Sequence, residues 1–132
     1  MKKKAKNKTI IIHPIGYVEN EFDLPTAPEI IRGCESTIIL DPDLTEGLLG
    51  LEAGQQVMVI FNFHLSEGFD LQQHPRGDVT RSQRGVFALR SPNRPNPIGV
   101  CIADILKIER NKLHVRGLDA INRTPVLDLK PA

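Results

Sequence analysis

The alternation of apolar and polar stretches along this 132-residue chain predicts a protein built mainly of β-strands. Apolar runs rich in β-branched residues recur between segments that contain Pro, Gly, Asp or Asn. The most apolar run, residues 57–63, is expected at the centre of a sheet. We expect strands over residues 9–18, 36–40, 56–63 and 85–89, a hairpin of strands 98–109 and 112–118 that turns at Arg110-Asn111, and a final extended piece over 126–129.

Leucines at helical spacing predict one short helix that begins near residue 41, with Asp41 or Asp43 as its cap and Gly54 as its stop. The stretches 19–33 and 66–84 are expected to be long loops, since neither carries a regular apolar period. So many strands on a small chain would leave exposed edges unless the sheet closed on itself. We therefore predict a mainly β fold, a closed or partly closed small β-barrel with one short helix and long functional loops.

Three prolines, Pro92, Pro95 and Pro97, stiffen the segment that follows residue 89. The residues before them are biased towards extended geometry, so this segment is neither a helix nor a central strand. It holds the guanidinium groups of Arg90 and Arg94 in fixed positions. Such a segment suits a clamp on an anionic or planar polar ligand, and it equally suits a rigid connection with solvated arginines. Stiffness alone supports both interpretations.

Composition and charge are typical of a single globular domain: 40% of the residues are hydrophobic, 25% are charged, and the net charge is +1. No apolar run is long enough to cross a membrane and no signal-peptide core follows the first lysines, so we expect a cytoplasmic protein without membrane contact. The two cysteines and four histidines show no ligand spacing, so no metal site is expected. We expect residues 1–8, which are rich in lysine, to form a disordered tail and residues 9–132 to form one domain.

Polar residues follow directly after several predicted strands, namely His64, Arg90, Asp119 and Asn122. Each has an ordinary explanation as a strand-end, surface or turn residue. Strand ends converge in a small barrel, however, so together these residues indicate a polar pocket built by loops that are distant in sequence. The pattern names no ligand for it. There is no G-x-G-x-x-G after a strand and no Walker loop, which argues against a Rossmann-type nucleotide site or a P-loop.

A basic cluster lies in the middle of the chain. Its members fall within residues 76–94 and are opposed there by Asp78 alone. On a chain with balanced net charge, such a cluster favours a localised phosphate-contacting patch. The cluster consists of Arg76, Arg81, Arg84, Arg90 and Arg94.

Two motifs allow a family to be named. Residues 85–99 read Gly-Val-Phe-x-x-Arg-Ser-x-x-Arg-Pro-Asn-Pro-Ile-Gly, and residues 118–131 read Leu-Asp-x-x-x-x-Thr-Pro-Val-Leu-Asp-Leu-Lys-Pro. The first resembles the signature of the TrmO family, also called TsaA-like or YaeB-like proteins. The second is similar to that family's terminal D-x-x-D-G-T-P-x-x-D-I-K-P motif. Shorter matches at residues 14–16, 50–52 and 63–64 extend the resemblance to about residues 11–131.

The resemblance implies a single-sheeted β-barrel that binds S-adenosylmethionine without a Rossmann fold, usually as a homodimer. It implies methyl transfer to the exocyclic nitrogen of threonylcarbamoyladenosine beside the anticodon of a tRNA. The missing glycine-rich loop agrees with this, because S-adenosylmethionine has no phosphates. The cofactor residues carried over by motif are Thr26, Ala27, Pro28, His64, Leu65, Arg90, Val100, Asp119, Ala120, Ile121 and Asn122, and no catalytic residue is assigned.

Within this resemblance, the basic cluster gains a specific partner. We expect its arginines to contact phosphates of the anticodon stem-loop, with an affinity that falls as salt rises. The residues expected to make these contacts are Arg76, Arg81, Arg84 and Arg94.

The chain departs from the family pattern at three places. It has Thr26-Ala27 where the family commonly has Arg-Gln, Leu65 where it has Gln, and Asn122-Arg123 where it has Asp-Gly. The change at Asn122 removes an acceptor charge, and Arg123 replaces a residue that adopts positive φ freely. The chain also ends at residue 132 without the C-terminal extension of many bacterial members. These departures leave two alternatives: a cofactor- or RNA-binding module without transferase activity, and a methyltransferase with another substrate.

Overall fold

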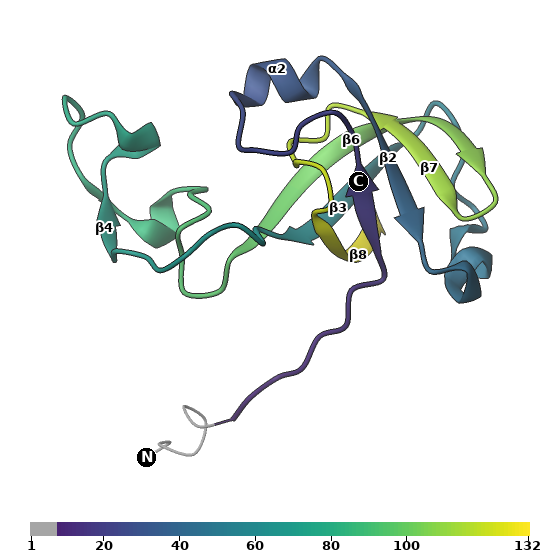
Figure 1. Cartoon of the computed structure of the whole chain (residues 1–132), viewed down its shortest axis with the longest axis horizontal. Helices are drawn as coiled ribbons and strands as arrows, with labels where there is room; N and C mark the ends of the chain where they lie inside the picture. The colour runs from purple at the N-terminus through teal and green to yellow at the C-terminus, as the bar shows by residue number, and fades with distance from the viewer. Residues whose placement is uncertain (1–7) are drawn as a thin grey trace.

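The computed structural model describes residues 8–132, which form a closed barrel with strand order β1-β2-β7-β6-β3-β8 (Figure 1). Every pair of neighbours in it is antiparallel. The predicted closed β-barrel is confirmed, whereas the tail predicted over residues 1–8 falls almost wholly outside the described residues. The strands are β1 (Gly16–Glu19), β2 (Glu35–Leu40), β3 (Gln56–Asn62), β6 (Ile98–Glu109), β7 (Lys112–Arg116) and β8 (Pro125–Pro131).

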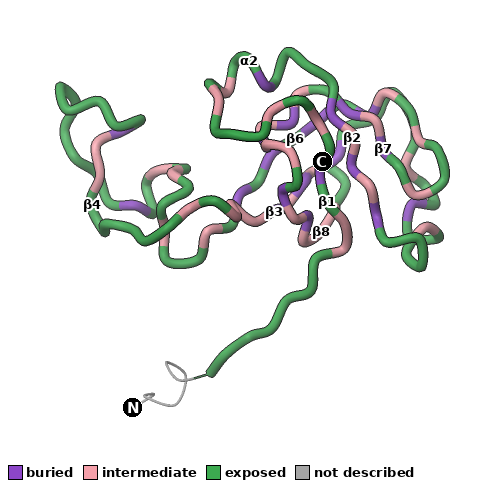
Figure 2. Tube along the Cα trace, in the orientation of Figure 1, coloured by how far each residue is buried: buried purple, intermediate pink, exposed green. Residues whose placement is uncertain are grey.

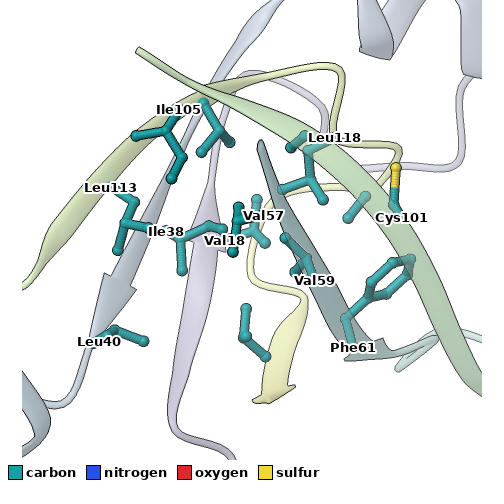
Figure 3. Packing of buried hydrophobic residues seen from close by; sticks show 14 of the residues in the cluster. Val18, Ile38, Leu40, Val57, Val59, Phe61, Cys101, Ile105, Leu113 and Leu118 are labelled. Atoms are coloured by element: carbon teal, nitrogen blue, oxygen red, sulfur yellow. The ribbon is translucent and has the colours of Figure 1, made fainter. Parts of the chain in front are cut away.

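Alternation along the strands fills the barrel interior. In β3 every second residue points inward, so Val57, Val59 and Phe61 are buried while the residues between them are partly exposed. They meet apolar side chains from all the other strands (Figure 3). A close approach fixes one motif glycine here: a Cβ on Gly99 would lie 2.7 Å from the rings of Phe61 and Phe63. The final Gly of the proline-rich motif is therefore required by packing.

Residues 63–97, between β3 and β6, leave the barrel and form a lobe beside it (Figure 1). The lobe contains the two-stranded sheet of β4 (Gln72–Gln73) and β5 (Arg84–Gly85), and the short 3-10 helices η2 (Pro75–Gly77) and η3 (Val86–Ala88). The strand predicted over residues 85–89 is therefore wrong. Val86 alone of that apolar run is buried, inside the lobe, while the Phe87 side chain is 78% exposed.

The strand predicted over residues 9–18 is wrong at its start. Pairing with β8 ends at Ile15, whose N–H donates to the Val126 carbonyl at 2.7 Å. The preceding Pro14 has no N–H to continue a ladder. Residues 8–14 leave the barrel as an extended, exposed segment (Figure 2). Its isoleucines, Ile10, Ile11 and Ile12, are 84%, 77% and 54% exposed.

Two predictions about helices need correction. The expected loop over residues 19–33 contains the helix α2 (Pro28–Arg32), which Ile31 anchors to the protein interior. The helix expected after residue 41 is the 3-10 helix η1 (Pro42–Leu48), and Asp41 caps it by accepting from the Asp43 N–H at 3.0 Å. Nothing in the sequence indicated α2, because a helix of five residues is too short to show an apolar period. The predicted hairpin turn at residues 110–111 is confirmed, since Glu109 pairs with Lys112.

Candidate functional site

Three of the connections between barrel strands lie at one end of the barrel. Residues 20–34 join β1 to β2, residues 63–97 join β3 to β6, and residues 117–124 join β7 to β8. We call this the loop end. The opposite end, which we call the turn end, carries residues 41–55 and the two-residue turn 110–111. The sequence-predicted cofactor residues lie on the three loops of the loop end, except Val100, which lies on β6 near that end.

Asp119 is the central charged group of the loop end. Its carboxylate is 30% exposed and its Oδ2 lies 3.6 Å from Nη2 of Arg32 on α2. Burial raises the pKa of the Asp119 carboxyl above its ordinary value, and Glu29 raises it further, while Arg32 and Arg76 oppose this shift. The site therefore holds a half-buried carboxylate between cations from two different loops. Such a group can accept hydrogen bonds from an amine or a hydroxyl of a ligand.

Sequence reasoning missed the role of α2. The positions of Glu29 and Arg32 beside Asp119 come from a helix that has no periodic signal, and an ion pair across the barrel end leaves no trace in sequence spacing. It also assigned Arg76 to RNA alone, although the charge of Arg76 acts on Asp119. Arg90 was expected to meet His64 and the 119–122 run. Among the described residues, no hydrogen bond or ion pair connects Arg90 to them.

The backbone beneath Asp119 is held by the core. The Asp119 N–H donates to Sγ of Cys101 at 3.4 Å, and that thiol donates to the Gly117 carbonyl at 3.2 Å. Figure 3 shows Cys101 at the edge of the apolar cluster, on β6. The next two N–H groups, those of Ala120 and Ile121, donate no hydrogen bond to any residue that the structure describes. Two adjacent free donors next to a carboxylate suit a planar heteroaromatic edge or a ligand oxygen.

Asn20, at the end of β1, ties the 117–124 loop to the barrel. Its Nδ2 donates to the Ala120 carbonyl at 2.8 Å and to Oγ of the buried Ser36 at 3.0 Å. Its Oδ1 accepts from the Phe22 N–H at 2.9 Å. No sequence motif pointed to Asn20, because its contacts join residues about a hundred positions apart.

Asn122 faces the 20–34 loop. Its Oδ1 accepts from the Asn20 N–H at 3.0 Å, and its Nδ2 donates to Oδ1 of Asp23 at 2.9 Å. Its own N–H donates to the Phe22 carbonyl at 2.7 Å. Both ends of the Asn122 side-chain amide are thus engaged by the protein. The following residue, Arg123, has a φ of +71°, which is the left-handed region expected where the family has Gly.

The other predicted residues take varied positions. Ala27 is the N-cap of α2 without a side-chain bond, and the Thr26 hydroxyl donates to the Leu24 carbonyl at 2.9 Å. His64 is half-buried, while Leu65 and Arg90 are exposed on the lobe. Val100 points outward from β6, away from the core.

The proline-rich segment of the lobe is braced as well as stiff. Arg94 donates from Nη1 to the carbonyls of Leu89 at 2.9 Å and Ser91 at 3.2 Å. Gln73 adds a bond from Nε2 to the Asn93 carbonyl at 2.7 Å. Arg94 therefore has a structural task within the lobe. The other three arginines of the expected RNA-contacting set, Arg76, Arg81 and Arg84, are exposed on the lobe.

Two features of the described chain concern metal binding and membrane insertion. Within residues 8–132, no three or more His, Cys, Asp or Glu side chains gather as they would around a metal ion. None of the helices over the same residues is long and apolar enough to cross a membrane.

One end of the closed barrel thus gathers a half-buried carboxylate, two backbone donors without a described partner, and flanking arginines. Comparison with known proteins shows the family to which the chain belongs. The model of the tRNA-methyltransferase O N-terminal domain matches residues 16–132, and the chain belongs to that family. The crystal structure of TrmO from Pseudomonas aeruginosa superposes with a TM-score of 0.71 at 32% identity, covering 95% of this chain and 56% of that one.

Curated relatives carry two kinds of name. The S-adenosyl-L-methionine-binding protein of Archaeoglobus fulgidus is 37% identical over 125 residues, which is 92% of this chain and 88% of the relative. The tRNA (adenine(37)-N6)-methyltransferase of Rattus norvegicus is 36% identical over 135 residues, which is 92% of this chain and 30% of the relative. The chain thus spans little more than half of the solved TrmO chain and under a third of the rat enzyme.

Proposed function

We propose that this chain binds S-adenosylmethionine at the loop end and transfers its methyl group to a tRNA base in the cytoplasm. The observation that carries the proposal is the half-buried Asp119 next to the free N–H groups of Ala120 and Ile121. Their donor and acceptor types fit this cofactor, which combines amine and hydroxyl donors with an adenine ring that accepts hydrogen bonds. When bound, the cofactor supplies a methyl group activated on a sulfonium cation.

The residues of the chain divide the binding task by chemistry. Asp119 accepts from an amine or hydroxyl of the cofactor, and the N–H groups of Ala120 and Ile121 donate to the adenine edge. Arg90 pairs with the carboxylate at the amino-acid end of the cofactor. The remaining residues carried over from the family line the same site; they are Thr26, Ala27, Pro28, His64, Leu65 and Val100. Methyl transfer to nitrogen depends mainly on in-line positioning, so no strong catalytic base is required.

The proposed substrate is the exocyclic nitrogen of threonylcarbamoyladenosine beside the tRNA anticodon. The names of the mammalian relatives, which act on adenine 37 of tRNA, support it. The exposed arginines of the lobe also support it, since Arg76, Arg81 and Arg84 present positive charge next to the loop end. Half-buried Arg94 braces the lobe and in this proposal contributes to RNA contact through the shape of the loop.

We also propose that the chain works as a homodimer. Three apolar side chains, Ile98, Val100 and Ile102, alternate along the outer face of β6 and are exposed. They begin at the loop end, so a second copy packed on this face would lie next to the site. Sedimentation of the wild type and of Ile102→Asp tests this, and an unchanged mass in the variant would contradict it.

Calorimetric titration with S-adenosylmethionine is the first test of the proposed activity. We expect saturable binding, and no binding at about millimolar cofactor would overturn the proposal. Nucleoside mass spectrometry of tRNA from cells with and without the gene is the second test. The methylated threonylcarbamoyladenosine should disappear with the gene. Binding with an unchanged nucleoside profile would favour one of the two alternatives, a module without transferase activity or a methyltransferase with another substrate.

A further inference from the structure

We infer that Asn20, Asp23 and Asn122 form a latch that holds residues 119–121 in the arrangement that binds the cofactor. In this account Asn122 is a positioning residue and does not contact the ligand. The inference rests on the proposed cofactor site at the loop end. It gives a role to Asn20 and Asp23, which no motif assigns. It also explains why this chain has Asn122 where the family motif has Asp.

The side-chain amide of Asn122 is hydrogen-bonded to the protein at both its oxygen and its nitrogen. Its oxygen accepts from the Asn20 N–H at 3.0 Å and its nitrogen donates to the Asp23 carboxylate at 2.9 Å. The Asn122 N–H donates to the Phe22 carbonyl at 2.7 Å. These three bonds turn the residue towards the 20–34 loop.

Asn20 links Asn122 to the proposed site by hydrogen bonds. Its Nδ2 bridges the Ala120 carbonyl at 2.8 Å and the buried Ser36 hydroxyl at 3.0 Å, so it fixes the peptide that links Ala120 to Ile121. The N–H groups of Ala120 and Ile121 are the free donors of the site. A loop that is already ordered loses less conformational entropy when a ligand binds. Substitutions that break the latch should therefore mainly lower the affinity for the cofactor.

The identities of Asn122 and Asp23 are matched. An aspartate at position 122, as the family motif has it, would still accept from the Asn20 N–H. It would, however, place a second carboxylate against Asp23, at a contact that is now 2.9 Å long. Two carboxylates at that distance repel unless one is protonated. With an amide at 122, a carboxylate at 23 becomes a good partner, so the loss of the family's Asp here strengthens a loop contact.

A charge cycle at this contact tests the latch by calorimetry with S-adenosylmethionine. Asn122→Asp should weaken binding at least about tenfold, because the repulsion opens the loop. Asp23→Asn alone should remain within about threefold of wild type, since its amide oxygen still accepts from Asn122. The double variant should return to within about threefold as well, because Asn at 23 donates to Asp at 122. Recovery by a second substitution separates a specific contact from general damage.

Two further variants keep the test decisive. Asp23→Ala, at an exposed position, removes the acceptor without adding repulsion, so it keeps the test decisive if Asn122→Asp fails to fold. It should weaken binding by about fivefold or more, whereas Asp23→Asn stays within about threefold. Asn111→Asp is the matched control: Asn111 donates from Nδ2 to the Leu40 carbonyl at 2.7 Å at the turn end. It should lower the melting temperature and leave cofactor affinity unchanged.

The outcomes distinguish the inference from the proposed function. A wild type that binds no S-adenosylmethionine overturns the proposed function. A wild type that binds, with Asn122→Asp binding equally well or the double variant failing to recover, overturns the latch alone. Equal loss of affinity in Asn111→Asp also overturns it, because the effect would then be a general consequence of instability.

Discussion

The two ends of the barrel use their polar groups differently. At the turn end, polar groups close the structure: Asp41 caps η1, and Asn111 donates to the Leu40 carbonyl in a tight hairpin turn. At the loop end, Asp119 is held half-buried beside free backbone donors, and its burial raises the pKa of its carboxyl. The polar groups of the turn end thus stabilise the fold, while the loop end keeps a partly buried carboxylate that burial disfavours in its charged form. That difference is typical of a binding site placed on a stable scaffold.

The largest effect on stability should come from the turn end. Leu48 of η1 is buried in the apolar cluster, and Leu48→Ala should lower the free energy of unfolding by about 2–5 kcal/mol because it leaves a cavity. Denaturant unfolding measures this, with Leu48→Met as a control of similar volume. Cofactor affinity of the folded protein should not change. A parallel loss of affinity would show that the two ends are coupled.

The next prediction concerns the loop end, where a substitution should lower cofactor affinity and leave stability unchanged. Asp119→Asn removes a charge-assisted acceptor worth about 1.5–3 kcal/mol, so S-adenosylmethionine should bind roughly ten- to a hundredfold more weakly. The barrel should be no less stable at neutral pH, because the substitution also removes a partly buried charge. Calorimetry measures the loss of affinity, and thermal unfolding measures the stability. Wild-type affinity in this variant would refute the placement of the site.

The pH dependence follows from the same carboxyl. A raised folded-state pKa means that Asp119 adds stability below its ordinary value of 3.8 and that this contribution is lost as pH rises through the folded pKa. The stability of wild type relative to Asp119→Asn should therefore fall with rising pH in that window. Cofactor affinity should rise over the same window as the carboxyl ionises. A flat difference between the two proteins would contradict the assignment.

The smallest predicted change is a gain. Arg123 has a φ of +71°, in a region that costs a residue with a Cβ roughly 1–2 kcal/mol. Arg123→Gly should therefore raise the free energy of unfolding by about 1 kcal/mol or less, since glycine also gains freedom in the unfolded chain. Chemical denaturation measures it, and Arg123→Ala, which keeps a Cβ, is the control. Equal stability of the two variants would exclude backbone strain.

Much of the scaffold could be predicted from sequence because alternation is a local signal. Most strands of the barrel, the β6–β7 hairpin and the Asp41 cap follow from residues within a few positions of one another. The motif comparison also singled out Asp119, which the structure places half-buried at the loop end. The flaws came where tertiary contacts decide: Ile10–Ile12 are apolar yet exposed, and residues 86–88 turn where a strand was expected.

The organisation of the site could not be predicted for the same reason. Asn20 and Asn122 are 102 residues apart, and no sequence pattern predicts the hydrogen bond between them. The ion pair of Arg32 with Asp119 depends on a five-residue helix that no period reveals. Long-range polar contacts thus complete a site whose individual residues look ordinary.

Amide chemical shifts recorded while S-adenosylmethionine is added to the isotope-labelled chain test the central claim most directly. Saturable shifts should concentrate at Ala120 and Ile121 and spread to neighbouring residues of the 20–34 and 63–97 loops. The turn end, residues 41–55 and 110–111, should remain unshifted. Shifts centred on the turn end, or none at saturating cofactor, would contradict the assignment of binding to the loop end.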